Sequence, residues 1–499
     1  MAHQEKATSG VEWRITLGDG SSKSLVPDAG PVSRIWIGLK GLIAGLVLKV
    51  WKFLKRAGDI GVDDPRKVIH CLKVGMALTV VSLFYYMRPL YKGVGGNAMW
   101  AIMTVVVVFE NTVGATICKS LNRVFGTTLA GFLAFGVHWV ASQSGQEFEP
   151  LITGASVFLL ASTATFSRFI PSVKARFDYG AMIFILTFSL VTVSGYRVDK
   201  LFDMAHQRIS TIIIGTSLCI LVTMFICPIW AGGELHILIS NNMDKLANSL
   251  VGCVDEHFNY NGELKDSDKQ PDKKLLGYKC VLSSKATEES IAKFARWEPA
   301  HGRFNFKHPW QQYLKIGASM RSCAYCVEAL NRCIDSENQA PEFTKKHLSN
   351  ICLKVSSNSS SVIKEVAKTI KTMKRSPSID SLVEEMRSAV QDLQNELNFL
   401  PKVLSPPEVL HPESKETEET TSSTTHLLEV IPVVTFASLM IEISSRIQAI
   451  VETVEELAEL AEFKGEVQEK AKQNQPNTNR IVASQLNDDQ QTMKALERV

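Results

Sequence analysis

A glutamate and two histidines lie close together in the stretch WEPAHGRFNFKHPW, residues 297–310. Glu298, His301 and His308 offer one carboxylate and two imidazoles, which are the ligand types of a zinc site and the groups of a general base with its orienting acid. Pro299 and Pro309 break any single helix that could align the three side chains. A three-ligand site would therefore need a loop folded for that purpose, and we predict neither a metal site nor a catalytic site here.

We expect instead that these residues form a proline-bounded turn between two helices. Trp297, Glu298 and Pro299 are its candidate structural motif, with Glu298 and Arg303 satisfying buried backbone groups or each other. Large rings would anchor the turn in the core; they are Trp297, Phe304, Phe306 and Trp310.

Ionisable residues inside apolar segments form a second group with chemical potential. Glu110 lies about 12 residues into the apolar run 98–118, or roughly 18 Å at the rise of a helix, which is near mid-membrane for a span. Such a carboxylate needs an interior face, a partner or a water-filled path. We keep two interpretations: a gating or pore role, and a buried charge satisfied by a neighbouring cation.

Five cations lie within the apolar runs or tight against them, and a cationic lining is what anion pores use. These candidate pore residues are Lys73, Lys119, Arg123, Arg168 and Arg208. The alternative is that each one follows from the excess of basic residues at inner flanks, with the long side chain of Lys73 reaching the surface.

Signals for enzymes, cofactors and nucleic-acid binding are poor. The sequence has no phosphate-cradling glycine motif and no nucleophile elbow, and its basic residues do not interleave with aromatics. Cys323 and Cys326 form a lone CxxC in a helical context, so we predict no zinc site. Glu147 and Glu149 offer hard oxygen ligands for an outer cation, although exposed carboxylates are usually only solvated. We predict no enzyme, no cofactor and no nucleic-acid partner.

Six apolar runs are long enough, or nearly so, to cross a bilayer as helices. Basic residues concentrate on the flanks that would face the cytosol if both termini lie there. Gly126, Ala130 and Ala134 repeat at a spacing that favours close helix packing in membranes. The predicted spans are 68–87, 98–118, 124–141, 151–167, 179–195 and 209–227.

The predicted fold is therefore an all-α membrane protein of six transmembrane helices with a C-terminal cytosolic helical domain. An N-terminal segment, 1–66, contains an amphipathic helix at 35–56 whose cations would meet anionic lipid, or which docks as a soluble helix. The remaining predicted regions are the pore domain 67–230, the helical domain 231–403, a disordered linker 404–428, a helix 429–472 with a heptad seam, and a disordered tail 473–499.

Two features of the C-terminal half suggest possible protein partners, a second subunit and a kinase. The heptad seam either docks on its own domain, which we favour, or pairs between subunits. Ser376 and Ser378 in KRSPSID lie at a predicted helix start, where they are candidate sites for a regulatory kinase or simply solvated caps.

Four blocks, in order, resemble the plant aluminium-activated malate transporter family: MWAIMTVVVVFENTVGATICKSLNRVFGTTLAG, ATFSRFIPSVKARFDYG, CPIWAGGELH and FARWEPAHGRFNFKHPWQQY. The resemblance covers about residues 60 to 400 and implies a homodimeric anion channel in a lipid bilayer, passing malate, chloride, nitrate or sulfate. It further implies pore-lining roles for Lys73, Lys119, Arg123 and Arg168, and places the glutamate of the TVVVVFE block at Glu110. Asn111 departs from the aromatic or aliphatic residue expected there.

We therefore predict a passive anion channel in the plasma membrane rather than the tonoplast. One alternative is a proton-coupled carboxylate transporter that uses Glu110 and His138. The other is a membrane-anchored helical scaffold that transports nothing, which accounts poorly for Glu110 and the clustered cations.

Overall fold

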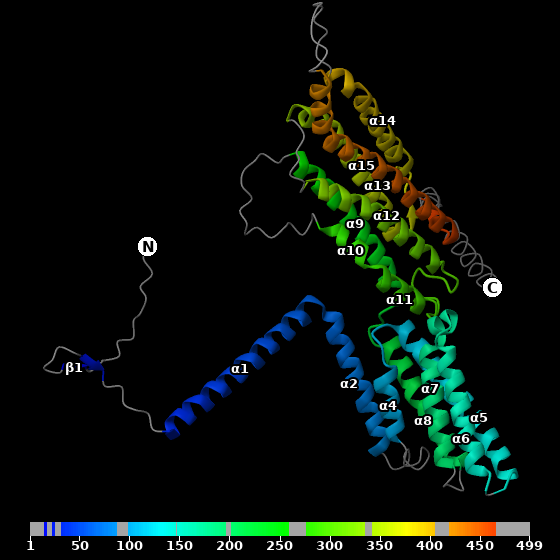
Figure 1. Ribbon diagram of the computed structural model, residues 1–499. Helices are drawn as coiled ribbons and strands as arrows, with labels where there is room; N and C mark the ends of the chain where they lie inside the picture. Colours follow the sequence, from blue (N-terminus) through cyan, green and yellow to red (C-terminus); the bar gives the residue numbers. More distant parts are fainter. Residues whose placement is uncertain are drawn as a thin grey trace, which may run out of the picture. The chain divides into compact units, whose positions relative to one another are not determined.

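The structure is a computed structural model that describes residues 14–16, 22–24, 31–86, 98–145, 147–195, 201–258, 276–334, 342–404 and 419–465. These residues are helical except for turns and two short strand pairs (Figure 1). The strands are β1 (Arg14–Thr16) with β2 (Ser22–Ser24), and β3 (Lys374–Arg375) with β4 (Lys464–Gly465).

The chain divides into two compact units, one ending at Leu72 and one beginning at Lys73. The first unit contains α1 (Pro31–Asp63) and the start of α2 (Pro65–Tyr86). Helix α1 extends beyond the predicted 35–56 at both ends. Its apolar side chains are largely exposed, as with Trp51 and Phe53, so α1 presents an apolar surface that nothing within its own unit covers.

Helices occur at all six predicted spans. After α2 come α4 (Ala98–Val108), α5 (Val113–Gln143), α6 (Glu149–Ser167), α7 (Pro171–Gly195) and α8 (Leu201–Phe225). Within the described residues, α5, α6, α7 and α8 contain stretches long and apolar enough to cross a membrane, while α4 is a shorter apolar helix. The prediction of an all-α membrane protein is confirmed.

The second predicted span is interrupted, which corrects its boundaries and the depth of Glu110. Helix α4 ends at Val108, and α5 begins at Val113 after the residues FENT. Thr112 is the N-cap of α5, its hydroxyl accepting a hydrogen bond from the Ala115 amide at 3.3 Å. Glu110 thus lies in a break between two helices, and the expected position 18 Å inside one continuous helix is wrong.

Small residues bring α5 and α7 together, as their spacing predicts. A Cβ atom on Gly126 would lie 2.6 Å from the carbonyl oxygen of Gly180, so the two backbones are in direct contact. Ala130 and Ala134 continue the contact and are buried with Phe188 of α7.

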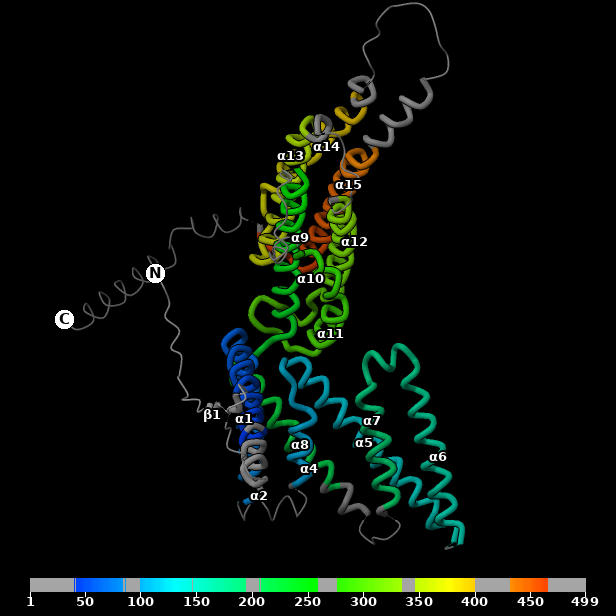
Figure 2. The backbone as a smooth tube through the Cα atoms, turned by 60° about the vertical axis from the view of Figure 1, so that its left-hand side comes forward, coloured from blue at the N-terminus to red at the C-terminus, as the bar shows by residue number. Residues whose placement is uncertain are grey.

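The C-terminal domain has one buried apolar core. Among the described residues, seven helices surround this core, and Figures 1 and 2 show how they are arranged. They are α9 (Ala231–Phe258), α10 (Gly277–Ser283), α11 (Lys285–Ala295), α12 (Trp310–Ile334), α13 (Glu342–Thr372), α14 (Ile379–Leu404) and α15 (Glu419–Leu460).

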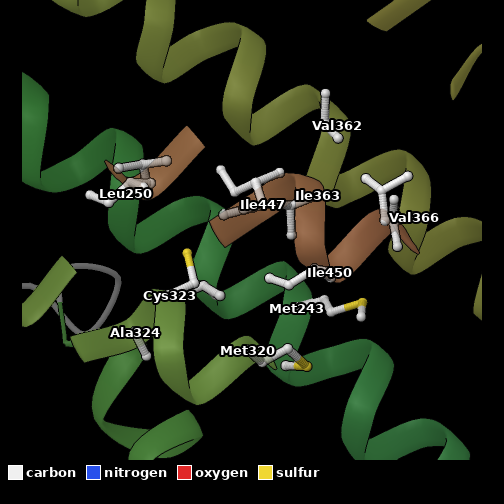
Figure 3. Close-up of a cluster of buried hydrophobic side chains, with 14 of the residues drawn as sticks. Met243, Leu250, Met320, Cys323, Ala324, Val362, Ile363, Val366, Ile447 and Ile450 are labelled. Atoms are coloured by element: carbon white, nitrogen blue, oxygen red, sulfur yellow. The ribbon is translucent and has the colours of Figure 1, made fainter. Parts of the chain in front are cut away.

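Helix α15 docks in this core, as the favoured interpretation of the heptad seam expects. Ile447 and Ile450 are buried, and Figure 3 shows them between Met243 of α9 and Ile363 and Val366 of α13. The segment from Ile431 to Leu460 is also long and apolar enough to cross a membrane, but its apolar side chains fill the domain core. Its apolarity therefore serves packing.

The predicted linker 404–428 and the predicted tail 473–499 lie wholly or partly outside the described residues. Helix α15 begins at Glu419, inside the predicted linker 404–428, while residues 405–418 lie outside the described part of the chain. The predicted tail 473–499 also lies outside it.

Candidate functional site

Lys73 is a buried cation whose partner is a neutral backbone group. Its side chain comes from α2 and is 2 % exposed, and its Nζ donates to the carbonyl oxygen of Cys227 at 2.7 Å. Cys227 has a φ of 42° in the turn between α8 and Pro228, so the chain bends there and aims its carbonyl at the ammonium. Because the partner is a carbonyl, the charge of Lys73 is not neutralised by it.

Arg123 is the buried cation of α5. It is 6 % exposed, and its Nη1 donates to the hydroxyl of Tyr179 on α7 at 3.1 Å. Its Nε has no hydrogen-bond partner in the described structure, and the same holds for the hydroxyls of Ser120 and Thr127. The spacing of three and four residues places all three on one face of α5. This face therefore carries a charge and unsatisfied polar atoms, which is unusual for a purely structural contact.

Arg208 provides a third buried cation, on α8. It is 8 % exposed, and its guanidinium carbon lies 4.2 Å from the ring centroid of Trp100 on α4. An aromatic face stabilises a cation without neutralising it.

Lys73, Arg123 and Arg208 share one property: none of them forms an ion pair with a carboxylate among the described residues. The three cations also lie at different distances along their helices from the end of the helix bundle where α5 begins and α8 ends. Arg123 lies about 15 Å along α5 from its first residue, and Arg208 about 25 Å along α8 from its last, at 1.5 Å per residue. Buried positive charge without a carboxylate partner among the described residues therefore occurs at several levels along these helices.

Two other predicted pore cations have carboxylate partners. Lys119 forms an ion pair with Glu110, and its Nζ lies 5.8 Å from the ring centroid of Tyr179. Arg168 pairs with Asp178, with 2.8 Å between Nε and Oδ1. All four charged side chains are about one-third exposed. Glu110 is thus a paired and partly exposed charge, whereas one of its two interpretations expected a buried charge with a neighbouring cation.

Tyr179 and Asp178 were not singled out from the sequence, although they contact three of the predicted cations. The sequence feature that could have identified them is the segment VKARFDYG, in which an acid and a tyrosine follow a basic cluster at the start of α7.

The outer carboxylates do not form an evident cation site. Glu147 is exposed and Glu149 lies in the first turn of α6. No group of three or more His, Cys, Asp or Glu suited to a metal ion occurs among the described residues. Two carboxylates at a surface leave most of the coordination shell of a small hard cation to water.

Glu298 of the WEP motif accepts three hydrogen bonds from backbone amides, and Nε2 of His301 lies 3.8 Å from its Oε2. Its Oε1 accepts hydrogen bonds from Ala231 at 2.6 Å and from Gly114 at 3.1 Å, and its Oε2 accepts one from Gly232 at 2.9 Å. Gly114 is in the first turn of α5, and the other two residues open α9. One carboxylate thus caps two helices, where free amides and the helix dipole both favour negative charge.

Close approach explains the glycines at this cap. A Cβ on Gly114 would lie 2.3 Å from the carbonyl oxygen of Phe294, and one on Gly232 would lie 2.3 Å from the ring of Trp310. The Val113 amide also donates to the Ile229 carbonyl at 2.9 Å. We call this contact region, formed by residues 109–116, 226–232 and 298, the junction, because it joins the membrane helices to the C-terminal domain.

The two histidines of the motif do not converge on a metal. His301 stacks on Trp230 with 3.8 Å between ring centroids, while Nε2 of His308 lies 3.3 Å from the hydroxyl of Tyr313. Phe304 contacts both imidazoles. The expected structural turn is therefore present between α11 and α12.

One detail of that turn differs from the expectation. Phe306 is 73 % exposed and anchors nothing, whereas Phe304 and Trp310 pack against the core. Glu298 contacts buried backbone amides, and Arg303 donates at an exposed position to a backbone carbonyl, that of Thr372, at 3.2 Å.

Burial sets the titration of the groups around the turn. It raises the pKa of Glu298, while the hydrogen bonds from Gly232, Ala231 and Gly114 act in the opposite direction. Burial lowers the pKa of His308 to about 4 and also lowers the pKa of His236, whose Nδ1 lies 2.9 Å from the Tyr313 hydroxyl. Both imidazoles are therefore neutral near pH 7.

Known proteins are similar to this chain over most of its length. The chain is 54% identical over 493 residues, 95% of this chain and 98% of the relative, to aluminum-activated malate transporter 10 of Arabidopsis thaliana. It is 43% identical over 443 residues to transporter 2 of the same plant, covering 88% and 84% of the two chains. It is 39% identical over 444 residues to transporter 1 of Triticum aestivum, covering 87% and 91%.

A family model described as "Aluminium activated malate transporter" matches residues 58–415 and 401–458. These matches include the three buried cations, the junction and most of α15. A family of transporters also agrees with the prediction that the chain is no enzyme. The chain belongs to the aluminium-activated malate transporter family.

Proposed function

We propose that this protein is an anion channel that lets malate and inorganic anions such as chloride, nitrate and sulfate move passively across a plant membrane. The observation that carries the proposal is the set of three buried cations, Lys73, Arg123 and Arg208, without carboxylate partners among the described residues. The names of the relatives support malate as a permeant anion.

The partners of these cations suit conduction better than tight binding. A carbonyl, a phenol hydroxyl and an indole ring hold each cation in place but leave its charge available to a passing anion. Conduction requires sites attractive enough for entry and weak enough for release, and several moderate sites at different depths meet that requirement. The paired residues Lys119 and Arg168 would contribute less, because a carboxylate already offsets each one.

The proposal includes orientation, membrane and assembly. Both termini would lie in the cytosol, since basic residues concentrate on the corresponding flanks. The protein would act in the plasma membrane rather than the tonoplast, which imaging of a fluorescently tagged chain can test. It would function as a homodimer. Helix α6 supports this, because within a single chain it buries none of its residues and leaves an apolar face for lipid or a second subunit.

Charge reversal at the buried cations tests the proposed path. Lys73→Glu and Arg123→Glu should each lower malate current by about tenfold or more at equal surface expression, because focused positive potential raises local anion concentration by such factors. Lys67→Glu is the matched control on α2, since Lys67 is 63% exposed and pairs with Asp64. Wild-type currents in both variants would remove the proposed path.

Recording during a pH jump separates the channel from its rivals. A reversal potential that follows protons rather than the anion would favour coupled carboxylate transport. The geometry gives that mechanism little support, because Glu110 is paired with Lys119 while His138 lies about 38 Å along α5 from its first residue. An electrically silent reconstituted protein would leave the scaffold interpretation.

A further inference from the structure

The connection between α13 and α14 contains a serine hydrogen-bonded to a carboxylate. Ser376 is half-buried, and its hydroxyl donates to Oε1 of Glu365 at 2.6 Å. Nζ of Lys368 donates to the same oxygen at 3.0 Å. Pro377 follows Ser376 and is exposed, and a residue that precedes proline favours an extended backbone. Oγ of Ser376 also lies 2.9 Å from Oγ of Ser378 and accepts a hydrogen bond from the Ser378 amide at 3.4 Å. The contact with Glu365 is therefore the one that ties this segment to α13.

An acid-lined cavity of about 210 Å³ lies beside Ser376, between α13, α14 and α15. Its lining includes Arg375, Asp380, Glu455 and Glu459. Burial raises the pKa of Glu455, and Asp380, Glu452 and Glu459 raise it further, while Arg375 acts in the opposite direction. Negative charge is therefore already crowded here, and Arg375 is the cation that offsets it.

The same connection holds the end of α15. Strand β3 pairs in parallel with β4, placing Lys374 opposite Lys464 and Arg375 opposite Gly465. The pair contains only two residues on each strand, and Ser376 directly follows β3. A strand pair of only two residues has little stability of its own and depends on the residues that flank it. A change at Ser376 therefore affects the pairing of Arg375, the residue before it.

We propose that Ser376 is a phosphorylation site and that a phosphoryl group there releases the C-terminal end of α15 from β3. In the reaction, Oγ of Ser376 attacks the γ-phosphorus of a nucleoside triphosphate held by a serine/threonine kinase. The new O–P bond forms as the bond to the β-phosphate oxygen breaks, and a nucleoside diphosphate leaves. The hydroxyl proton passes to the kinase's catalytic base, and the product carries close to two negative charges.

Charge explains the release. Phosphoserine has no hydroxyl to donate to Glu365, so a hydrogen bond becomes a contact between like charges. The acidic side chains of the cavity add to this repulsion. Lys368 already pairs with Glu365 and Arg375 already offsets the acids of the cavity, so each cation would have to be shared between these carboxylates and the phosphate.

Ser378, two residues further on, should behave differently. It is exposed, and its carbonyl accepts a hydrogen bond from the Leu382 amide at 3.1 Å, so it stands at the start of α14. Negative charge at the N-terminus of a helix is stabilising. Because Oγ of Ser378 lies only 2.9 Å from Oγ of Ser376, comparing charge at the two positions tests whether the exact position of the charge decides the release.

The test uses the full chain in lipid nanodiscs, treated with a proline-directed kinase and ATP or mock-treated. Mass spectrometry locates the phosphate, and amide hydrogen exchange is followed at Lys464, Gly465 and the last turn of α15. We expect phosphate on Ser376 and exchange faster by about tenfold or more, since local opening sets this rate. Ser376→Ala should remove both effects.

Three variants give a second measurement that needs no kinase. Ser376→Glu should accelerate exchange at β4, Ser378→Glu should not, and adding Glu365→Gln to Ser376→Glu should restore part of the protection. Phosphate on Ser378 alone, unchanged exchange after modification of Ser376, or equal effects of the two glutamates would each overturn the proposal. Because modification follows folding in the first measurement, a variant that fails to fold does not prevent a decision. None of these measurements depends on anion conduction.

Discussion

Glu298 accepts hydrogen bonds from three backbone amides that belong to two different helices. The residue is 4 % exposed, so its charge is stabilised by these amides and by the helix ends rather than by water. A carboxylate is the natural group for this position because it only accepts hydrogen bonds, whereas each amide can only donate one.

Glu298→Gln should destabilise the junction measurably. The side-chain amide would turn an NH₂ group toward a backbone N–H, leaving buried donors without an acceptor, at a cost of about 1 to 3 kcal/mol. Glu298→Ala should cost more, since all three amides lose their acceptor. Thermal unfolding in detergent measures both, with the exposed Glu289→Gln on α11 as control. Equal melting temperatures for all four proteins would contradict the capping role.

A second prediction at this scale concerns pH. The pKa of His308 is lowered from 6.5 to about 4 in the fold, so the unfolded chain takes up the proton first. The stability that the neutral imidazole contributes is complete above pH 6.5 and is lost as the pH falls toward about 4. At pH 5 the loss should reach about 2 kcal/mol.

Melting curves between pH 7 and pH 5 measure this loss. His308→Phe keeps the ring but cannot titrate, so its stability should fall less over this range. His236, whose pKa is also lowered, contributes in the same direction in both proteins. Parallel curves for wild type and His308→Phe would show that His308 does not titrate as expected.

At the scale of elements, the position of a helix end decides which charged side chains meet. The break at residues 109–112 converts one predicted span into a short α4 and a long α5, and it places Glu110 beside Lys119 rather than in mid-helix. Asn111 and Thr112 favour caps because their short polar side chains compete for backbone amides. Thr112 is the N-cap of α5 and Asn111 directly precedes it.

Helix α15 should be indispensable to the C-terminal domain. Removing residues 419–499 would expose the apolar side chains of α9, α12 and α13 that now pack against it. We expect the truncated chain to aggregate or to lose cooperative unfolding, because single buried Leu, Ile or Met side chains each contribute about 2 to 5 kcal/mol. Size-exclusion chromatography measures this, and truncation after Gly465, which keeps α15 and β4, is the control. A monodisperse chain without α15 would contradict its role in the core.

At the scale of the whole molecule, the membrane helices of the second unit and the C-terminal domain share contacts at the junction. Lys73 reaches the Cys227 carbonyl there, Val113 bonds to Ile229, and Glu298 caps α5 and α9 together. The cations proposed to attract anions and the motif of the C-terminal domain are thus parts of one connected structure. Substitution of Glu298 should therefore alter the start of α5, the helix that also carries Arg123.

The sequence by itself determined the helical class, the positions of the apolar helices apart from the break between α4 and α5, the small-residue contact of α5 and the docked seam of α15. Each of these depends on local hydrophobic periodicity or residue size, which is written directly in the order of residues. Only the tertiary structure decided which cations are paired and which are not. Lys119 and Arg168 meet carboxylates, while Arg123 and Arg208 meet aromatic residues distant in sequence. The sequence predicted that Glu298 would satisfy buried backbone groups, but only the tertiary structure identified them as amides of α5 and α9, because every residue type carries the same backbone N–H.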